Sequence, residues 1–211
     1  MAPETLPVKS YKKGFIFKRN ISNWSRWLHI YLSMISFFVL FFFAVTGLTL
    51  NHTEWFTSQQ HTQSKKGKVD PKWVNTPDSA SVARLEIVEF MRKTHNVKGA
   101  MTEFTTDEYQ CTVSFNGPGY TADVFINRED GVYDFSETTT GAFGVMNDLH
   151  KGRDSGKAWS LLIDISAVLM VVVSLTGLVM LFFLKKKRVA GLVLMAVGLI
   201  LLYLVYIIWV P

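Results

Sequence analysis

Three long apolar blocks constrain this chain more than any other feature of its sequence. They cover residues 28–50, 159–184 and 189–210. The first and third blocks contain no charged residue, and the second contains one, Asp164. About 20 apolar residues suffice to cross a hydrocarbon core of about 30 Å, so each block is long enough to span a membrane. The sequence therefore predicts a membrane protein with three transmembrane helices.

The charged residues predict the orientation of these helices. Residues 1–27 carry six basic residues against one acid, Glu4, and residues 185–188 are all basic. Basic segments beside a span remain on the cytoplasmic side. Residues 51–158 carry 12 basic and 15 acidic residues, a net charge of −3, and fall outside. We expect the N-terminus inside and the C-terminus outside. The first block is too long and starts too late to be a cleaved signal peptide.

The external segment is predicted to form a small α+β domain over about residues 78–136. Residues 57–70 are polar and predict a flexible connection. Apolar residues at helical spacing predict a helix over 82–91, with Asp78 or Ser79 as its N-cap. Apolar and polar residues alternate over 101–106, 109–115 and 120–127, and residues 132–135 form a shorter stretch of the same kind. Turn sequences separate the later stretches, so we predict a small antiparallel sheet.

Charge and cysteine content exclude several classes of function. The net charge of +5 lies in the cytoplasmic flanks, where it attracts anionic lipid, so we expect no nucleic-acid partner. Cys111 is the single cysteine and is expected to be a buried free thiol. No C-x-x-C-H motif occurs, so any haem would be held non-covalently. The external segment shows no nucleophile–base arrangement and no phosphate-binding loop.

Three of the five histidines stand at predicted membrane boundaries: His29, His52 and His150. The other two, His61 and His95, fall in polar stretches, and we expect His61 to be solvated and His95 to be structural. A boundary imidazole can hold haem iron while the porphyrin lies among apolar side chains. It can also serve only as an interfacial anchor, and both readings stay open here.

Topology decides which of these histidines could share one iron. His29 and His52 are 23 residues apart, about 34 Å along a helix, and stand at opposite membrane faces. His52 and His150 both fall on the outer face, where they form a candidate pair of axial ligands. His29 has no imidazole partner on its side. It could pair across a homodimer, take a non-histidine ligand, or act as an anchor.

Two further features lie within the apolar blocks. Asp164 stands about five residues into the second block, where it either orients a ligand or haem propionate or reaches interfacial water. Residues 44–48, AVTGL, resemble residues 174–178, SLTGL. Thr and Gly let membrane helices approach closely, so we expect helix packing from this repeat. Gly47 lies about 140° around a helix from His52 and does not share its face.

Several short motifs resemble those of the PepSY-associated transmembrane helix proteins. The segment resembling a PepSY domain ends in residues 124–133. The resemblance runs from about residue 20 to 185, and its motifs are Arg26-Trp27-Leu28-His29, Thr46-Gly47, Asp148-Leu149-His150-Lys151-Gly152 and Thr176-Gly177-Leu178.

This resemblance implies a function. The family includes bacterial inner-membrane ferric-siderophore reductases that hold haem b between membrane helices, so it implies electron delivery to a periplasmic iron complex. The resemblance implies that His29 and His150 occupy haem-ligand positions of the family. His52 is added as a candidate ligand because topology places it on the same membrane face as His150. Larger members have four or more spans, so a complete two-haem path is not expected from one copy of this chain. A homodimer or an iron-uptake protein are the partners it suggests. The alternative is a non-enzymatic membrane module whose PepSY-like domain binds or regulates a partner protein.

Overall fold

The computed structural model describes residues 13–211, so the first 12 residues of the basic N-terminal segment lie outside the described part. The chain divides into two compact units, each described by itself. One, the helical unit, comprises the residues up to Leu40 together with Ile165–Pro211. The other, the sheet unit, comprises Phe41–Asp164.

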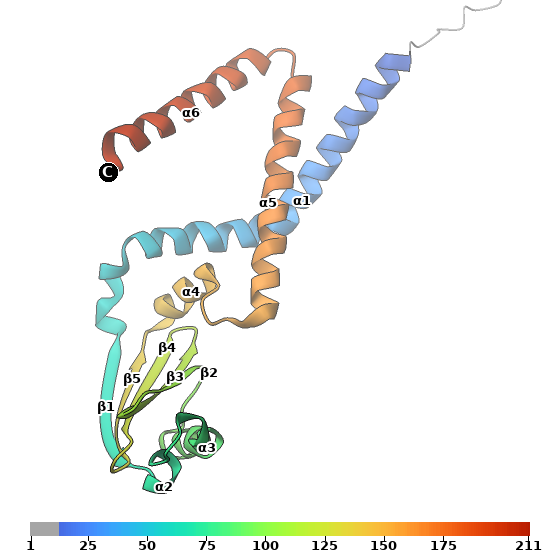
Figure 1. Cartoon of the computed structure of the whole chain (residues 1–211). Helices are drawn as coiled ribbons and strands as arrows, with labels where there is room; N and C mark the ends of the chain where they lie inside the picture. Colours follow the sequence, from blue (N-terminus) through green and yellow to red (C-terminus); the bar gives the residue numbers. More distant parts are fainter. Residues whose placement is uncertain (1–12) are drawn as a thin grey trace, which may run out of the picture. The chain divides into compact units, whose positions relative to one another are not determined.

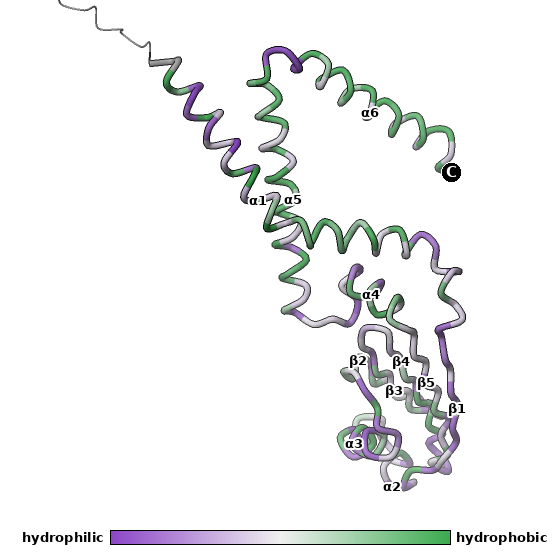
Figure 2. Tube along the Cα trace, turned by 180° about the vertical axis from the view of Figure 1, so that it is seen from behind, coloured by the Kyte–Doolittle hydropathy of each residue, from purple (hydrophilic) through white to green (hydrophobic). Residues whose placement is uncertain are grey.

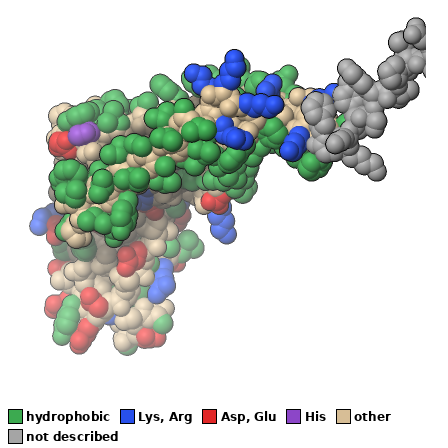
Figure 3. All heavy atoms as spheres, turned by 90° about the horizontal axis from the view of Figure 1, so that it is seen from above, with side chains coloured by type: hydrophobic (Ala, Val, Ile, Leu, Met, Phe, Trp, Pro, Cys, Tyr) green, Lys and Arg blue, Asp and Glu red, His purple; other side chains and the backbone are tan. Residues whose placement is uncertain are grey.

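Three helices are long and apolar enough to span a membrane. They are α1 (Lys13–Asn51), α5 (Gly156–Phe183) and α6 (Arg188–Trp209). Figure 2 shows that hydrophobic residues dominate all three, and Figure 3 shows hydrophobic side chains covering their surfaces. The three predicted transmembrane helices are therefore confirmed. The first helix begins at Lys13, earlier than the apolar block.

A five-stranded antiparallel sheet forms the extramembrane part of the sheet unit (Figure 1). Its spatial order is β1-β5-β4-β3-β2. The last four strands form the predicted meander. The strands are β1 (His61–Lys68), β2 (Ala100–Thr106), β3 (Gln110–Gly117), β4 (Tyr120–Asn127) and β5 (Val132–Thr139).

The prediction of a flexible connection over residues 57–70 is wrong. A 3-10 helix covers Thr53–Gln59, and β1 follows it and pairs with β5 from His61 opposite Thr139 to Lys68 opposite Val132. β1 is almost entirely exposed and carries no alternating apolar pattern, so nothing in its residues indicates a strand. It is a strand because β5 offers an open edge, which is the context dependence expected of β-structure.

One face of the sheet is buried against α3 (Arg84–His95). Ile87 and Met91 from α3 pack with Phe115 and Phe135 from the sheet in a fully buried cluster. Asp78 caps a short 3-10 turn ahead of α3 rather than α3 itself, because its carboxylate accepts from the N–H of Ala80.

The expectation for Cys111 is confirmed. It is a buried free thiol in the same apolar core, and burial raises its pKa.

A short helix that was not predicted from the sequence links the sheet to α5. It is α4 (Ala142–Lys151), and it ends at Gly152 in the left-handed conformation. His150 therefore stands on α4, ahead of the second membrane helix, in a ten-residue element of its own. This element places His150 against α1.

Candidate functional site

His150 lies in a site built from α1 and α4, which we call the His150 site (His150, Phe43, Thr46 and Gly47). Its Nδ1 atom lies 2.6 Å from Oγ1 of Thr46, a fully buried residue. The next residue on α1 is Gly47, where an added Cβ would lie 3.7 Å from Cε1 of His150. The ring of Phe43 meets the imidazole edge-on at a centroid distance of 5.0 Å. One face of α1 thus receives the imidazole.

The hydrogen bonds of Thr46 fix the proton on His150. The hydroxyl of Thr46 donates to the carbonyl of Phe42 at 2.6 Å, so its oxygen is left to accept from the imidazole. On this basis we assign the proton of His150 to Nδ1. Burial, aided by the charge of Lys151, lowers the pKa of His150 and favours the neutral ring. A neutral ring with Nδ1–H has a lone pair on Nε2.

Three further hydrogen bonds hold α4 in position. They run from Thr49 Oγ1 to Asn147 Oδ1 (2.6 Å), from Trp159 Nε1 to the carbonyl of Leu149 (2.8 Å) and from the N–H of Gly119 to Asp148 Oδ2 (2.9 Å). The first joins α4 to α1, the second joins it to α5, and the third joins it to the turn between β3 and β4. Asn147 is buried, so its bond to Thr49 is shielded from water. The position of His150 is therefore fixed from three directions.

His29 lies in a second site, built from α1 and α5, which we call the His29 site (His29, Val173, Thr176 and Gly177). Nδ1 of His29 lies 3.0 Å from Oγ1 of Thr176 and 3.1 Å from the carbonyl oxygen of Val173. The hydroxyl of Ser25 donates to the carbonyl of Thr176 at 3.1 Å and joins the same two helices. An added Cβ at Gly177 would lie 3.2 Å from Cε1 of His29.

The proton on His29 is fixed in the same way. A carbonyl oxygen only accepts, so the contact with Val173 requires a proton on Nδ1. The hydroxyl of Thr176 also donates to the carbonyl of Val173, at 2.8 Å, which leaves its oxygen to accept from the ring. When His29 is neutral, the lone pair lies on Nε2. Within residues 13–211, no hydrogen bond reaches the Nε2 atom of either His29 or His150.

The two sites explain the internal repeat in the sequence. Each Thr accepts from an imidazole Nδ1, and each Gly leaves room beside the Cε1 atom of the same ring. Sequence reasoning attributed the repeat to helix packing. It did not connect the two Thr-Gly pairs with His150 and His29. The repeat itself was the available signal, but the histidines lie 104 and 147 residues from the Thr they contact.

The structure gives His52 and Asp164 different surroundings. Nδ1 of His52 lies 3.1 Å from a carboxylate oxygen of Glu54, and the ring stacks on Trp55 at 4.1 Å. Within the described part of the chain, no hydrogen bond or ring contact joins His52 to His150. Asp164 is exposed on α5. The pairing of His52 with His150 therefore stays a prediction, as does a supporting role for Asp164.

The histidines expected to be non-functional have simple settings. His61 is exposed on β1. His95 ends α3, where its Nε2 atom lies 2.8 Å from the hydroxyl of Tyr133 and its ring stacks on Phe135 at 4.2 Å. One ring face and one ring nitrogen of His95 thus contact residues of the core of the sheet unit.

Comparison with known families decides the relationship of this chain. A model of the PepSY_TM-like family matches residues 23–211. The chain belongs to the PepSY_TM-like family. The match covers both histidine sites, all of α5 and α6, and α1 from Asn23 onward. Comparison with curated proteins and with solved structures gave no match.

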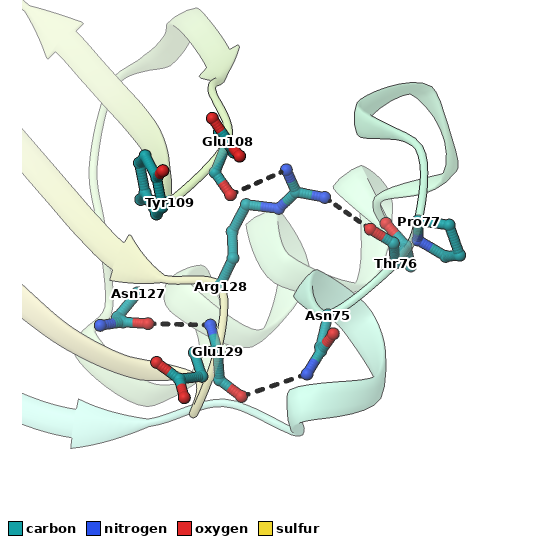
Figure 4. A pocket seen from close by; sticks show the side chains of 8 residues that line it. All are labelled: Asn75, Thr76, Pro77, Glu108, Tyr109, Asn127, Arg128 and Glu129. Carbon is teal, nitrogen blue, oxygen red and sulfur yellow. Dashed lines mark hydrogen bonds between the residues drawn. The ribbon is translucent and has the colours of Figure 1, made fainter.

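This PepSY_TM-like protein also has a cavity of about 420 Å³ on the sheet unit, beside Arg128 (Figure 4). The guanidinium group is buried and donates to the backbone carbonyls of Val74, Thr76 and Asp107, at 3.1, 2.7 and 2.6 Å. Its N–H groups are thus used to join the loop after α2 (Pro71–Val74) to the strand turns. We therefore assign Arg128 a structural role. The sequence did not indicate this role, because Arg128 lies in a predicted turn.

Proposed function

We propose that this membrane protein binds haem b through His150 and His29 and passes electrons to an iron complex on the periplasmic side of a bacterial inner membrane. The reductase-like part of the proposal rests on the resemblance of its sequence motifs to those of ferric-siderophore reductases. The haem-binding part rests on the geometry of the two histidine sites.

The observation that carries the proposal is the state of the two imidazoles. Histidines that bind metals almost always donate their second ring N–H to a carbonyl, carboxylate or water, which fixes the tautomer and raises the basicity of the ligating nitrogen. Nδ1 of His29 donates to a carbonyl and a Thr hydroxyl, and Nδ1 of His150 donates to a Thr hydroxyl, which leaves each Nε2 with a lone pair. An interfacial anchor has no need of that arrangement, and two copies of it favour ligation.

The residues of the chain have separate roles in this proposal. His150 and His29 each offer Nε2 to an iron, while Thr46 and Thr176 hold the ring orientation. Membrane helices supply the apolar surroundings that a porphyrin needs. His52 is the predicted second ligand on the side of His150. When bound, haem b supplies one-electron chemistry, with a potential set by the ligands and by burial.

The visible spectrum of the protein purified in detergent after expression with added haem tests this proposal. We expect a Soret band that shifts on reduction with dithionite and α and β bands in the reduced protein. His150→Ala and His29→Ala should each remove part of the absorbance, and the double variant should remove nearly all of it. His52→Ala tests the second ligand, because its loss should convert a six-coordinate spectrum to a five-coordinate one.

His61→Ala is the matched control, because His61 is exposed on β1 and contacts neither site. Its spectrum should equal that of the unmodified protein. A colourless unmodified protein would overturn the proposal and favour a module that binds a partner protein. Full absorbance in the double variant would show that other residues bind haem.

A further inference from the structure

The helical unit carries an unbalanced positive charge. Residues 13–40 and 165–211 contain no Asp or Glu. They contain eight basic residues: Lys13, Lys18, Arg19, Arg26, Lys185, Lys186, Lys187 and Arg188. The two ion pairs among the described residues, His52–Glu54 and Lys66–Asp134, both lie in the sheet unit. Within residues 13–40 and 165–211, these eight cations therefore have no acidic side chain to balance them.

Part of this charge surrounds a pocket. A pocket of about 370 Å³ is lined by Arg26 of α1, by Phe183 at the end of α5 and by residues 184–187 of the turn that follows. Three of those turn residues are Lys, so four cationic side chains border the pocket. Figure 3 shows Lys and Arg side chains gathered together among the apolar side chains of the helices.

The lining also defines the chemistry of an occupant. Arg binds phosphate through a planar fork of N–H groups, and Lys adds compact positive charge. Phe183 and Leu184 give the pocket an apolar part at the end of a membrane-spanning helix. A small soluble anion would use only the cations, whereas a phospholipid would use both parts. Basic pockets between membrane helices on the cytoplasmic side are typical sites for acidic lipid headgroups.

We propose that this pocket, formed by Arg26 and residues 183–187, binds the headgroup phosphate of an anionic phospholipid. Arg26 reaches the pocket from α1, and the Lys residues come from the turn between α5 and α6. One bound lipid therefore bridges two chain segments that are far apart in the sequence. This proposal is independent of haem binding.

Native mass spectrometry of the delipidated protein in a neutral detergent tests the proposal. Phosphatidylglycerol is added to one sample and zwitterionic phosphatidylcholine to another. We expect one phosphatidylglycerol to bind more tightly than phosphatidylcholine. Arg26→Gln should weaken that binding about fivefold, the loss expected for one basic contact. The side chain of Arg26 is exposed, and circular dichroism checks that the variant keeps its helix content.

Lys18→Gln is the matched control, because it removes the same charge from the same helix but does not line the pocket. Its affinity for phosphatidylglycerol should change little. An equal loss of phosphatidylglycerol affinity in Lys18→Gln and Arg26→Gln would overturn the proposed binding site and indicate diffuse electrostatic attraction of the lipid. Equal binding of the two lipids would overturn it as well. Displacement by glycerol 3-phosphate at the concentration of the lipid would show a soluble-anion site and overturn the lipid as occupant.

Discussion

The His29 site and the His150 site share one local design and differ in what supports it. In each, an imidazole Nδ1 meets a Thr hydroxyl and the following Gly leaves space beside the ring. His29 lies between two membrane helices and has a second acceptor, the carbonyl of Val173. His150 has Thr46 as its only Nδ1 partner among the described residues, but its helix is anchored by additional hydrogen bonds.

The two sites are therefore sensitive to different substitutions. The His29 site has a spare acceptor but a tighter approach at its glycine, 3.2 Å against 3.7 Å for an added Cβ. The His150 site has more room but depends on one hydroxyl and on the docking of α4. The same chemistry should therefore fail through different substitutions at the two places.

The largest expected effect is at the threonines. Thr46→Val leaves the half-buried Nδ1–H of His150 without an acceptor, which costs about 1–3 kcal/mol or lets the ring turn away. We expect haem affinity at this site to fall by at least about fivefold. Thr176→Val should have a smaller effect, because Val173 still accepts from His29. Haem titration of each variant measures this, with the other site removed by His29→Ala or His150→Ala.

Equal losses in the two valine variants would contradict the distinction between the sites. Threonine-to-serine variants serve as controls, because serine keeps the hydroxyl and should restore most of the affinity. In the haem-free protein, nitrogen-15 spectra of labelled histidine report the tautomer directly, and Thr46→Val should reduce the Nδ1–H signal of His150.

The next largest effect is expected at the glycines, where the His29 site should be more sensitive than the His150 site. Gly177→Ala forces the ring of His29 to move by a few tenths of an ångström, because the new Cβ would lie 3.2 Å from Cε1. We expect a loss of haem affinity of about fivefold, near the low end of overpacking costs. Gly47→Ala meets only ordinary contact and should leave affinity unchanged while strengthening the helix. Titration in the single-site backgrounds compares them, and a larger loss for Gly47→Ala would contradict the geometry.

A smaller effect should follow from loosening α4. Asn147→Ala removes the acceptor of the hydrogen bond from Thr49 and should destabilise the docked helix by about 1 kcal/mol. Because Lys151 and Arg153 follow at the end of α4, limited trypsin digestion there should become faster. Haem affinity at the His29 site should not change. An unchanged digestion rate would show that the other two hydrogen bonds suffice to hold α4.

The smallest effect concerns His95, a histidine with neither Thr nor Gly beside its ring nitrogen. Burial lowers the pKa of His95, and the nearby charge of Lys65 lowers it further. In the unfolded chain, His95 takes up a proton near its ordinary pKa of 6.5, whereas in the folded domain it does so only at a lower pH. Stability should be full above that pH and fall as the pH drops toward the lower pKa of the folded state.

Thermal unfolding of the protein between pH 7.5 and 5.5 should show this fall as a few degrees in Tm. His95→Gln should reduce the pH dependence, whereas His61→Ala, at an exposed position, should preserve it. An unchanged slope in His95→Gln would assign the dependence to another group. Neither variant should alter the visible spectrum, which separates a structural histidine from the two proposed ligands.

Sequence reasoning predicted most of the fold. Apolar length gave the three membrane helices, and alternation with turn residues gave β2 to β5. It missed β1, whose polar residues form a strand only because β5 has a free edge. It also missed α4 as a separate helix, although His150 was already a candidate residue. Local patterns therefore identified the elements that bury a continuous apolar surface and missed those defined by their neighbours.

The amino-acid sequence alone was enough to predict a membrane protein and to show that a Thr-Gly pair occurs twice. It also marked His29, His52 and His150 as candidate haem ligands, which stays a prediction. The folded structure was needed to show that Thr46 and Gly47 face His150 and that Thr176 and Gly177 face His29. Hydrophobic periodicity reports which face of a helix avoids water, but not which distant side chain meets that face. Those contacts depend on how helices pack across more than 100 residues of sequence, and packing is a property of the folded chain.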